Sequence, residues 1–178
     1  MSKTKSLFAR MLLVVSPLVL SLTSLATPAH SQFNQDTGAY VFGAATGGHL
    51  GGFGVDEGVG LIGLRAGYGH AWDNVAVEGQ LAYATFLADG QFANGGLFVP
   101  SVSAKYLFGD PGDRARINLG GGTDFMMIVD FDGAGIGFPW GHLMAGVDIQ
   151  VSPSSDVYFE ARTYGLITLA HVGMRFAF

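Results

Sequence analysis

The sequence predicts an all-β fold, an eight-stranded antiparallel up-and-down transmembrane β-barrel with a polar, largely filled lumen. Three observations lead to this prediction. The 178 residues are 49% hydrophobic and only 13% charged, with a mean hydropathy of +0.36, which excludes a disordered chain and is unusual for a soluble surface. No apolar run reaches the roughly 18 residues of a spanning helix. Instead, segments of alternating apolar and polar residues recur along the chain.

The N-terminal segment predicts export. Three basic residues precede an apolar stretch at 11–22, and small residues follow it. This order is typical of a secretory signal peptide, which we assign to residues 1–31. We expect cleavage after Ser31, with a cut after Ala29 as the alternative. An uncleaved membrane anchor is disfavoured by Pro17, which interrupts the apolar stretch.

The segment 32–178 is expected to form one barrel domain. Removal of the signal peptide takes three of the nine basic residues and no acidic residue. The remaining 147 residues carry six basic and 14 acidic groups, a net charge of −8. This balance opposes nucleic-acid binding, which needs a basic surface. The lack of cysteine excludes disulfides and Cys-ligated zinc.

Eight segments show the alternation of a membrane strand, and each has one apolar face. In chain order they are 38–48, 59–69, 75–86, 96–108, 115–127, 140–151, 156–164 and 168–178. The first is the least determined, because Ala39, Val41, Gly43 and Ala45 fit either face. The apolar faces of the other seven are represented, in order, by Leu64, Leu81, Val102, Leu119, Leu143, Phe159 and Val172.

The opposite faces carry the charges, including five of the six basic residues after the signal peptide. The charged positions are Arg65, Glu78, Lys105, Arg116, Asp124, Asp148, Glu160, Arg162 and Arg175. A soluble lipocalin-like barrel would have the reverse polarity. Each lipid-facing Arg or Lys near the midplane costs about 2–4 kcal/mol, so these side chains are expected to point inward. We predict that they form a paired polar network in the lumen, with Arg65–Glu78 and Arg162 with Glu160 or Asp148 as plausible neighbours.

The connections are expected to alternate in length. Segments 70–74, 109–114 and 152–155 are short, whereas 49–58, 87–95 and 128–139 are longer and rich in glycine. Short periplasmic turns and longer outer loops are typical of bacterial outer-membrane barrels. We therefore expect a location in the outer membrane of the Gram-negative cell envelope, with both termini in the periplasm.

Two segments carry a resemblance to a known family. Residues 66–70 with 75–79, and the ending 172–178, resemble the small eight-stranded outer-membrane barrels of the OmpA, OmpX and opacity-protein type. The resemblance implies that the aromatic ending, Phe176 and Phe178, is an assembly signal for the barrel assembly machinery. It also implies periplasmic chaperones, outer-membrane lipids and lipopolysaccharide as partners.

We expect a structural or surface-interaction role without catalysis. An eight-stranded barrel is just wide enough for side chains to fill, so paired charges favour a plug. A narrow, porin-like ion or small-solute pore is the alternative. The inward glycines, such as Gly67 and Gly69, either make room for bulky neighbours or leave water-filled gaps.

A lipid-modifying enzyme is a third and weaker hypothesis. Asp124, His142, His171 and Tyr164 are expected near the outer end of the lumen, with Ser101 below them. They suggest a Ser/His/Asp set or a weak metal site, but the His-x-Ser pattern of the barrel lipid A deacylases and a G-x-S-x-G elbow are missing. We expect an ordinary polar lining, with no catalytic residue, metal or cofactor.

Acidic residues are concentrated in the expected outer loops, at Asp56, Glu57, Asp89, Asp130 and Asp132. Because these loops contain no Lys or Arg, direct binding of lipopolysaccharide phosphates is not expected, although divalent cations can bridge. The segment from Asp130 does not fit a calcium loop, because its fifth and twelfth positions are Ala134 and Gly141.

The expected assembly signal can be tested by deletion. Removal of Phe178 is expected to lower the outer-membrane yield more than replacement of any single loop aspartate, such as Asp56→Ala. Immunoblots of fractionated membranes measure the yield. Equal yields would contradict the assignment.

Overall fold

A computed structural model describes residues 37–50, 59–88, 91–110, 113–130, 135–165 and 167–178. Several sequence-based predictions fall outside these residues: the signal peptide 1–31 and the loop residues Asp56, Glu57, Asp89 and Asp132. Within the described residues, no helix is long and apolar enough to cross a membrane.

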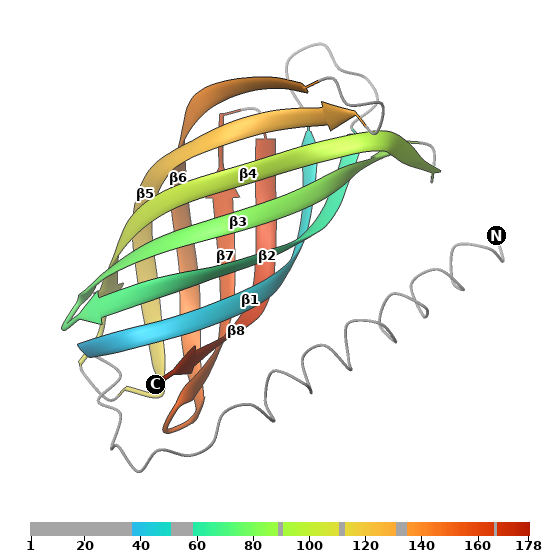
Figure 1. Cartoon of the computed structure of the whole chain (residues 1–178). Coiled ribbons are helices and arrows are strands. Elements are labelled where there is room, and N and C mark those ends of the chain that lie inside the picture. The colour runs from blue at the N-terminus through green and yellow to red at the C-terminus, as the bar shows by residue number, and fades with distance from the viewer. Residues whose placement is uncertain (1–36, 51–58, 89–90, 111–112, 131–134, 166) are drawn as a thin grey trace, which may run out of the picture. The chain divides into compact units, whose positions relative to one another are not determined.

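Eight antiparallel strands close into one barrel (Figure 1). They are β1 (Thr37–Leu50), β2 (Val59–Trp72), β3 (Val75–Ala88), β4 (Gln91–Phe108), β5 (Ala115–Asp130), β6 (Gly135–Ser152), β7 (Ser155–Thr163) and β8 (Ile167–Ala177). Each strand pairs with its neighbours in sequence, and β1 pairs with β8 to close the cylinder. The predicted fold class is therefore confirmed.

The alternation of side chains follows the predicted polarity. Outward side chains such as Leu81 and Leu143 are 55% and 68% exposed, whereas the charged faces of the strands lie inside. The structure also shows which residues of the first strand face inward. Tyr40 and Phe42 of β1 point inward and are buried, while Val41 faces outward. Because the side-chain period of a strand is two, this fixes the whole register of β1.

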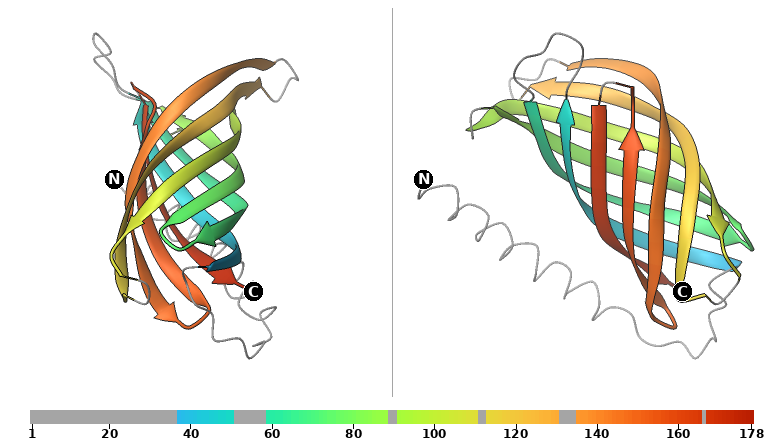
Figure 2. Two further views of the ribbon diagram at one scale, coloured as in Figure 1. Left: turned by 90° about the vertical axis from the view of Figure 1, so that its left-hand side faces the viewer. Right: turned by 180° about the vertical axis from the view of Figure 1, so that it is seen from behind.

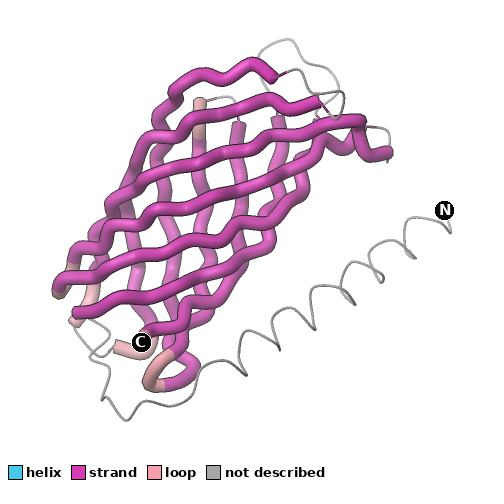
Figure 3. Tube along the Cα trace, viewed as in Figure 1, coloured by secondary structure: helices cyan, strands magenta, loops and turns pink. Residues whose placement is uncertain are grey.

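Strands β3, β4, β5 and β6 are longer than predicted at the barrel end opposite the Asp73 turn. Strand covers nearly all of the described chain (Figure 3). The expected loop at 87–95 is mostly strand, because Leu87 pairs with Phe92, and only residues 89–90 separate β3 from β4. The expected loop at 128–139 is likewise reduced to 131–134, since Ile128 pairs with Ile136. The prediction of long loops at these two places was wrong. Glycine-rich sequence was interpreted as loop, although glycine also fits a paired strand where neighbours supply the hydrogen bonds.

The barrel wall is uneven in height. Strands β4, β5 and β6 have 18, 16 and 18 residues, whereas β7 and β8 have 9 and 11. The upper parts of β5 and β6 curve past the ends of β7 and β8 (Figure 2). At the other barrel end, two-residue turns connect β2 to β3 and β6 to β7. Asp73 adopts a φ of 49° in the turn before β3, a conformation that Asp tolerates better than most residues.

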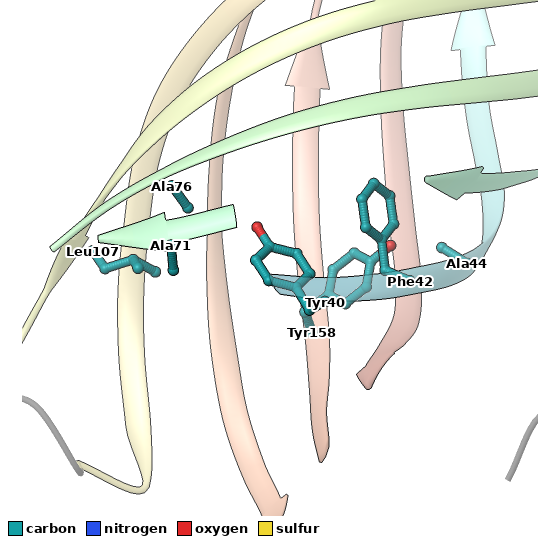
Figure 4. Close-up of a cluster of buried hydrophobic side chains, with 7 residues drawn as sticks. All are labelled: Tyr40, Phe42, Ala44, Ala71, Ala76, Leu107 and Tyr158. Atoms are coloured by element: carbon teal, nitrogen blue, oxygen red, sulfur yellow. The ribbon is translucent and has the colours of Figure 1, made fainter. Parts of the chain in front are cut away.

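Two apolar clusters lie inside the barrel, one toward each end. The first contains Tyr40, Phe42 and Ala44 of β1 and Tyr158 of β7, with Ala71, Ala76 and Leu107 nearer the turns (Figure 4). The second contains Leu61, Ala84, Leu97, Val99, Met126, Tyr164 and Leu169. Charged side chains lie beside the first cluster and between the two clusters, so polar and apolar groups share the lumen.

The closed hydrogen-bond ladder predicts heat-modifiable migration on a denaturing gel. Unboiled protein should migrate differently from boiled protein, because the barrel has no free edge from which detergent can unzip it. Val172→Pro, which places proline in the β8 ladder, is expected to abolish the shift, while Val172→Ala retains it. Identical migration of boiled and unboiled wild-type protein would contradict a closed barrel.

Candidate functional site

The lumen brings together the charged residues that the sequence singled out. All nine are at most 8% exposed, and they come from β2 to β8. Inward alternation of these seven strands places all nine inside the barrel, at several heights between the turns and the opposite end. The charges are thus removed from both lipid and water, which requires close pairing.

Glu160 of β7 binds two guanidinium groups. Its Oε1 atom accepts hydrogen bonds from Arg65 Nη1 and Arg162 Nε, both at 2.7 Å. The side chains of Arg65 and Glu160 are both fully buried. Arg162 also donates to Gln80 Oε1 at 3.2 Å, and Gln80 donates to Ser101 Oγ at 2.6 Å. This chain of contacts crosses the barrel from β2 through β7 to β3 and β4.

Glu78 of β3 is the second centre of the network. Its carboxylate pairs with Lys105 Nζ and accepts a hydrogen bond from the Tyr40 hydroxyl at 2.8 Å. Arg175 Nε lies 3.5 Å and Arg162 Nη2 3.9 Å from its oxygens. Three cations therefore surround one carboxylate, and Arg162 links the Glu78 and Glu160 groups.

Asp148 of β6 completes the ion pairs on the side nearer the turns. Its Oδ2 atom lies 2.6 Å from Arg175 Nη1, and its Oδ1 atom accepts a hydrogen bond from Asn118 Nδ2 at 3.0 Å. Arg116 donates to Asn74 Oδ1 in the β2–β3 turn at 2.6 Å.

The observed partners differ in part from those expected. Arg162 pairs with Glu160, which was one of its two expected partners. Arg65 pairs with Glu160 in place of Glu78, and Asp148 pairs with Arg175 in place of Arg162. Which charges meet across the lumen depends on strand tilt and stagger, which the alternation of residues does not specify.

Three aromatic rings that the sequence analysis did not assign to the lumen support the cations. The Tyr158 ring lies between Arg65 and Arg175, whose guanidinium carbons are 5.2 and 4.3 Å from its centroid. Phe42 lies 5.4 Å from Arg65, and Tyr40 lies 5.8 Å from Arg175. Such cation–π contacts are favourable where water is excluded. The period of two could have placed Tyr158 inside, since it shares the face of Glu160.

Two inward glycines make room for these rings. A Cβ atom at Gly69 would lie 2.3 Å from the Tyr40 ring, and one at Gly67 would lie 2.5 Å from Phe42 Cζ. Of the two roles left open for these glycines, the structure thus favours accommodation of bulky neighbours. A larger residue at either position would displace a ring that contacts the network.

Asp124 and His142 form a separate pair above the charged layer. The Asp124 carboxylate contacts His142 Nδ1, and both side chains are fully buried. The Tyr164 ring centroid is 5.5 Å from that of His142, whereas His171 Nδ1 is 2.8 Å from Thr46 Oγ1.

The Ser101 hydroxyl is bonded to Gln80, so the described contacts do not join Ser101, His142 and Asp124 into a triad. Within the part of the chain that the structure describes, no group of three or more His, Asp or Glu side chains is arranged to hold a metal ion.

A small cavity of about 50 Å³ opens at the barrel end where β1 begins and β8 ends. Its lining includes Lys105, Arg116, Asp148 and Arg175. Above the charged layer, a second interior space of about 20 Å³ is bounded largely by the second apolar cluster. These volumes hold a few water molecules at most.

The two residues of the expected assembly signal lie at the end of the last strand. Phe176 is partly buried and pairs with Val41 of β1, while Phe178 is 69% exposed. The Phe178 ring lies 6.4 Å from that of Tyr68. Both therefore contribute to the outward aromatic surface near the turns.

Comparison with known proteins places the fold. No protein-family model matches the chain, and no curated protein matches it in sequence. Among solved structures, Neisserial surface protein A (NspA) is similar with a TM-score of 0.59 and 16% identity, over 80% of this chain and 98% of that one. The chain has the fold of the small eight-stranded outer-membrane barrels.

Two further solved structures are similar to the chain in fold. The attachment invasion locus protein Ail of Yersinia pestis has a TM-score of 0.50 and 13% identity, over 80% of this chain and 99% of that one. A de novo designed transmembrane β-barrel has the same score and identity, over 82% of this chain and 100% of the design. At such identities the likeness concerns the fold alone.

Loss of Glu160 should destabilise the barrel strongly. Glu160→Ala leaves Arg65 and Arg162 without their shared carboxylate, and breaking a buried pair costs about 3–5 kcal/mol. Urea unfolding in lipid vesicles, followed by tryptophan fluorescence, measures the loss in the free energy of unfolding. Asp110→Ala, at an exposed aspartate of the β4–β5 turn, is the control and should change it by less than about 0.5 kcal/mol. Equal effects of the two substitutions would contradict the network.

Proposed function

We propose that the chain is an integral barrel of the bacterial outer membrane with a structural or surface-interaction role and no catalytic activity. In this proposal, residues 1–31 are a cleaved signal peptide and residues 32–178 form the barrel. Outer-membrane lipids and lipopolysaccharide surround the outward face. The barrel assembly machinery and periplasmic chaperones are its partners in biogenesis.

The membrane location is supported by the distribution of polarity. Outward leucine, valine and isoleucine side chains form an apolar surface that is unfavourable in water. In contrast, five of the six basic residues after the signal peptide are buried inside the barrel. The sixth, Arg114, is exposed in the turn between β4 and β5. The fold likeness to outer-membrane barrels agrees with this location.

The observation that carries the structural role is the filling of the lumen by charged and apolar side chains. Ions that enter through the small cavity near the turns meet the paired charges around Glu78 and then the apolar cluster around Leu97 and Met126. Apolar constrictions of this kind block conduction by excluding water.

A narrow pore is the second candidate. The cavity near the turns favours it, because its lining reaches Lys105 and Arg175 in the charged layer. Conduction would require the apolar cluster at the other end to separate. The structural role and the pore thus differ in whether the folded barrel conducts ions.

Planar-bilayer recordings separate these functions. Folded wild-type protein, checked by its heat shift, is expected to give no unit currents. The double variant Leu97→Ser, Met126→Ser should give unit currents, because it removes two buried apolar side chains from the blocking layer. Leu143→Ser, on the outward face, is the control and should stay silent. Reproducible currents from the wild-type protein would replace the structural role with the pore.

A further inference from the structure

An apolar groove of about 570 Å³ lies on the outer face of the barrel wall, across β3 to β6. The rings of Tyr83, Phe98 and Phe125 line it, together with two aliphatic side chains of β5. On β6 its lining consists of Gly135 and Gly137. The Phe125 ring leans over the neighbouring strand, since a Cβ atom at Gly137 would lie 2.6 Å from it.

The backbone itself produces this groove. Outward positions lower on β6 carry Leu143 and Val147, but the first two outward positions of the strand, Gly135 and Gly137, have no side chain. Next to the groove, the pairing of β4 with β5 breaks off after Phe98 and resumes at Ser101. Pro100 lies in this gap and has no N–H group to donate to a ladder. The two glycines therefore form the floor of the hollow on β6, and the rings of Tyr83, Phe98 and Phe125 form its walls.

The chemistry of the lining indicates the occupant. None of the described residues that line the groove is charged, and the tyrosine hydroxyl is the one polar side-chain group among them. A hollow between aromatic rings loses dispersion contacts unless a matching apolar group fills it. On the outer face of a membrane barrel the available apolar group is a lipid acyl chain.

The position of the groove indicates the source of that chain. It extends to Val129 and Gly135, which flank the β5–β6 connection at the barrel end opposite both termini. With the termini in the periplasm, this end lies in the outer leaflet, which consists of lipopolysaccharide. The described residues at this end include no Lys or Arg that would bind a lipid phosphate. The groove itself, with its uncharged lining, therefore recognises the hydrocarbon part of the lipid.

We propose that this groove is a lipid site that seats one acyl chain of a lipopolysaccharide molecule from the outer leaflet. The inference rests on the proposed outer-membrane location. It adds to that location a defined place on the barrel where one lipid is held more tightly than the lipids around it.

The test measures lipid that stays bound during purification. The full chain is produced in a Gram-negative host whose truncated lipopolysaccharide has a uniform mass, and the barrel is extracted in mild detergent. Native mass spectrometry then reports the fraction of barrel that carries one lipopolysaccharide or one phospholipid. We expect one lipopolysaccharide on the wild-type protein.

Two variants change the groove and one matched variant does not. Gly135→Leu fills the groove at a position where a Cβ atom meets only the Ile128 carbonyl oxygen, at 3.1 Å. Phe98→Ala removes one of its walls. Each should lower the bound fraction about tenfold, the effect of displacing roughly two buried methylene groups. Gly79→Leu, at an outward glycine with open space around its Cβ position, should leave it unchanged.

The outcomes separate this inference from the proposed function. Equal lipid retention in Gly135→Leu and Gly79→Leu, a phospholipid in place of lipopolysaccharide, or a folded wild-type barrel without bound lipid overturns the acyl-chain site alone. A wild-type protein that shows no heat shift and is not found in the membrane overturns both proposals.

Discussion

The ion pairs around Glu78 and Glu160 are the interaction on which the rest of the barrel depends. Backbone hydrogen bonds join each strand only to its two neighbours, whereas these carboxylates connect strands across the lumen, such as β2 with β7. Buried charges are expensive unless they are closely paired, so the position of each cation constrains the strand that carries its anion. A one-residue slip of any of these strands would turn a charge toward lipid. The network thus specifies the register of the barrel as well as filling it.

The limited width of an eight-stranded barrel restricts which side chains fit beside the ion pairs in the lumen. Two arginines and two carboxylates at one level leave little space, and the bulky rings of Tyr40 and Phe42 must still fit beside them. Gly69 and Gly67 resolve this conflict, because each lies beneath one of the two rings. The high glycine content, which looks like loop sequence, is therefore partly a consequence of packing aromatic and charged groups inside a narrow cylinder.

The fold could be predicted from the sequence, because the alternation of polarity along a strand directly records which side faces lipid. Outward Leu81 and inward Glu78 illustrate this alternation, and its recurrence in eight segments predicted the class and the strand count. Strand ends and charge partners were not accessible in this way. Ile128 and Ile136 pair although glycine-rich sequence lies between them, and Arg65 meets Glu160 because strand tilt brings β7 to it. Both depend on three-dimensional closure, which a linear pattern does not contain.

The apolar part of the lumen is the feature that most changes the functional interpretation. Leu61, Leu97 and Met126 occupy inward positions of the same strands that carry the charges lower down, so inward does not mean polar along the whole strand. A conducting channel needs a continuous polar lining, and these side chains interrupt it at the end opposite the termini. Their burial leaves the outer surface and the upper wall as the parts of the molecule exposed to other molecules. The tall, glycine-hollowed wall of β4 to β6 is consequently where a specific contact with lipid can arise without opening the barrel.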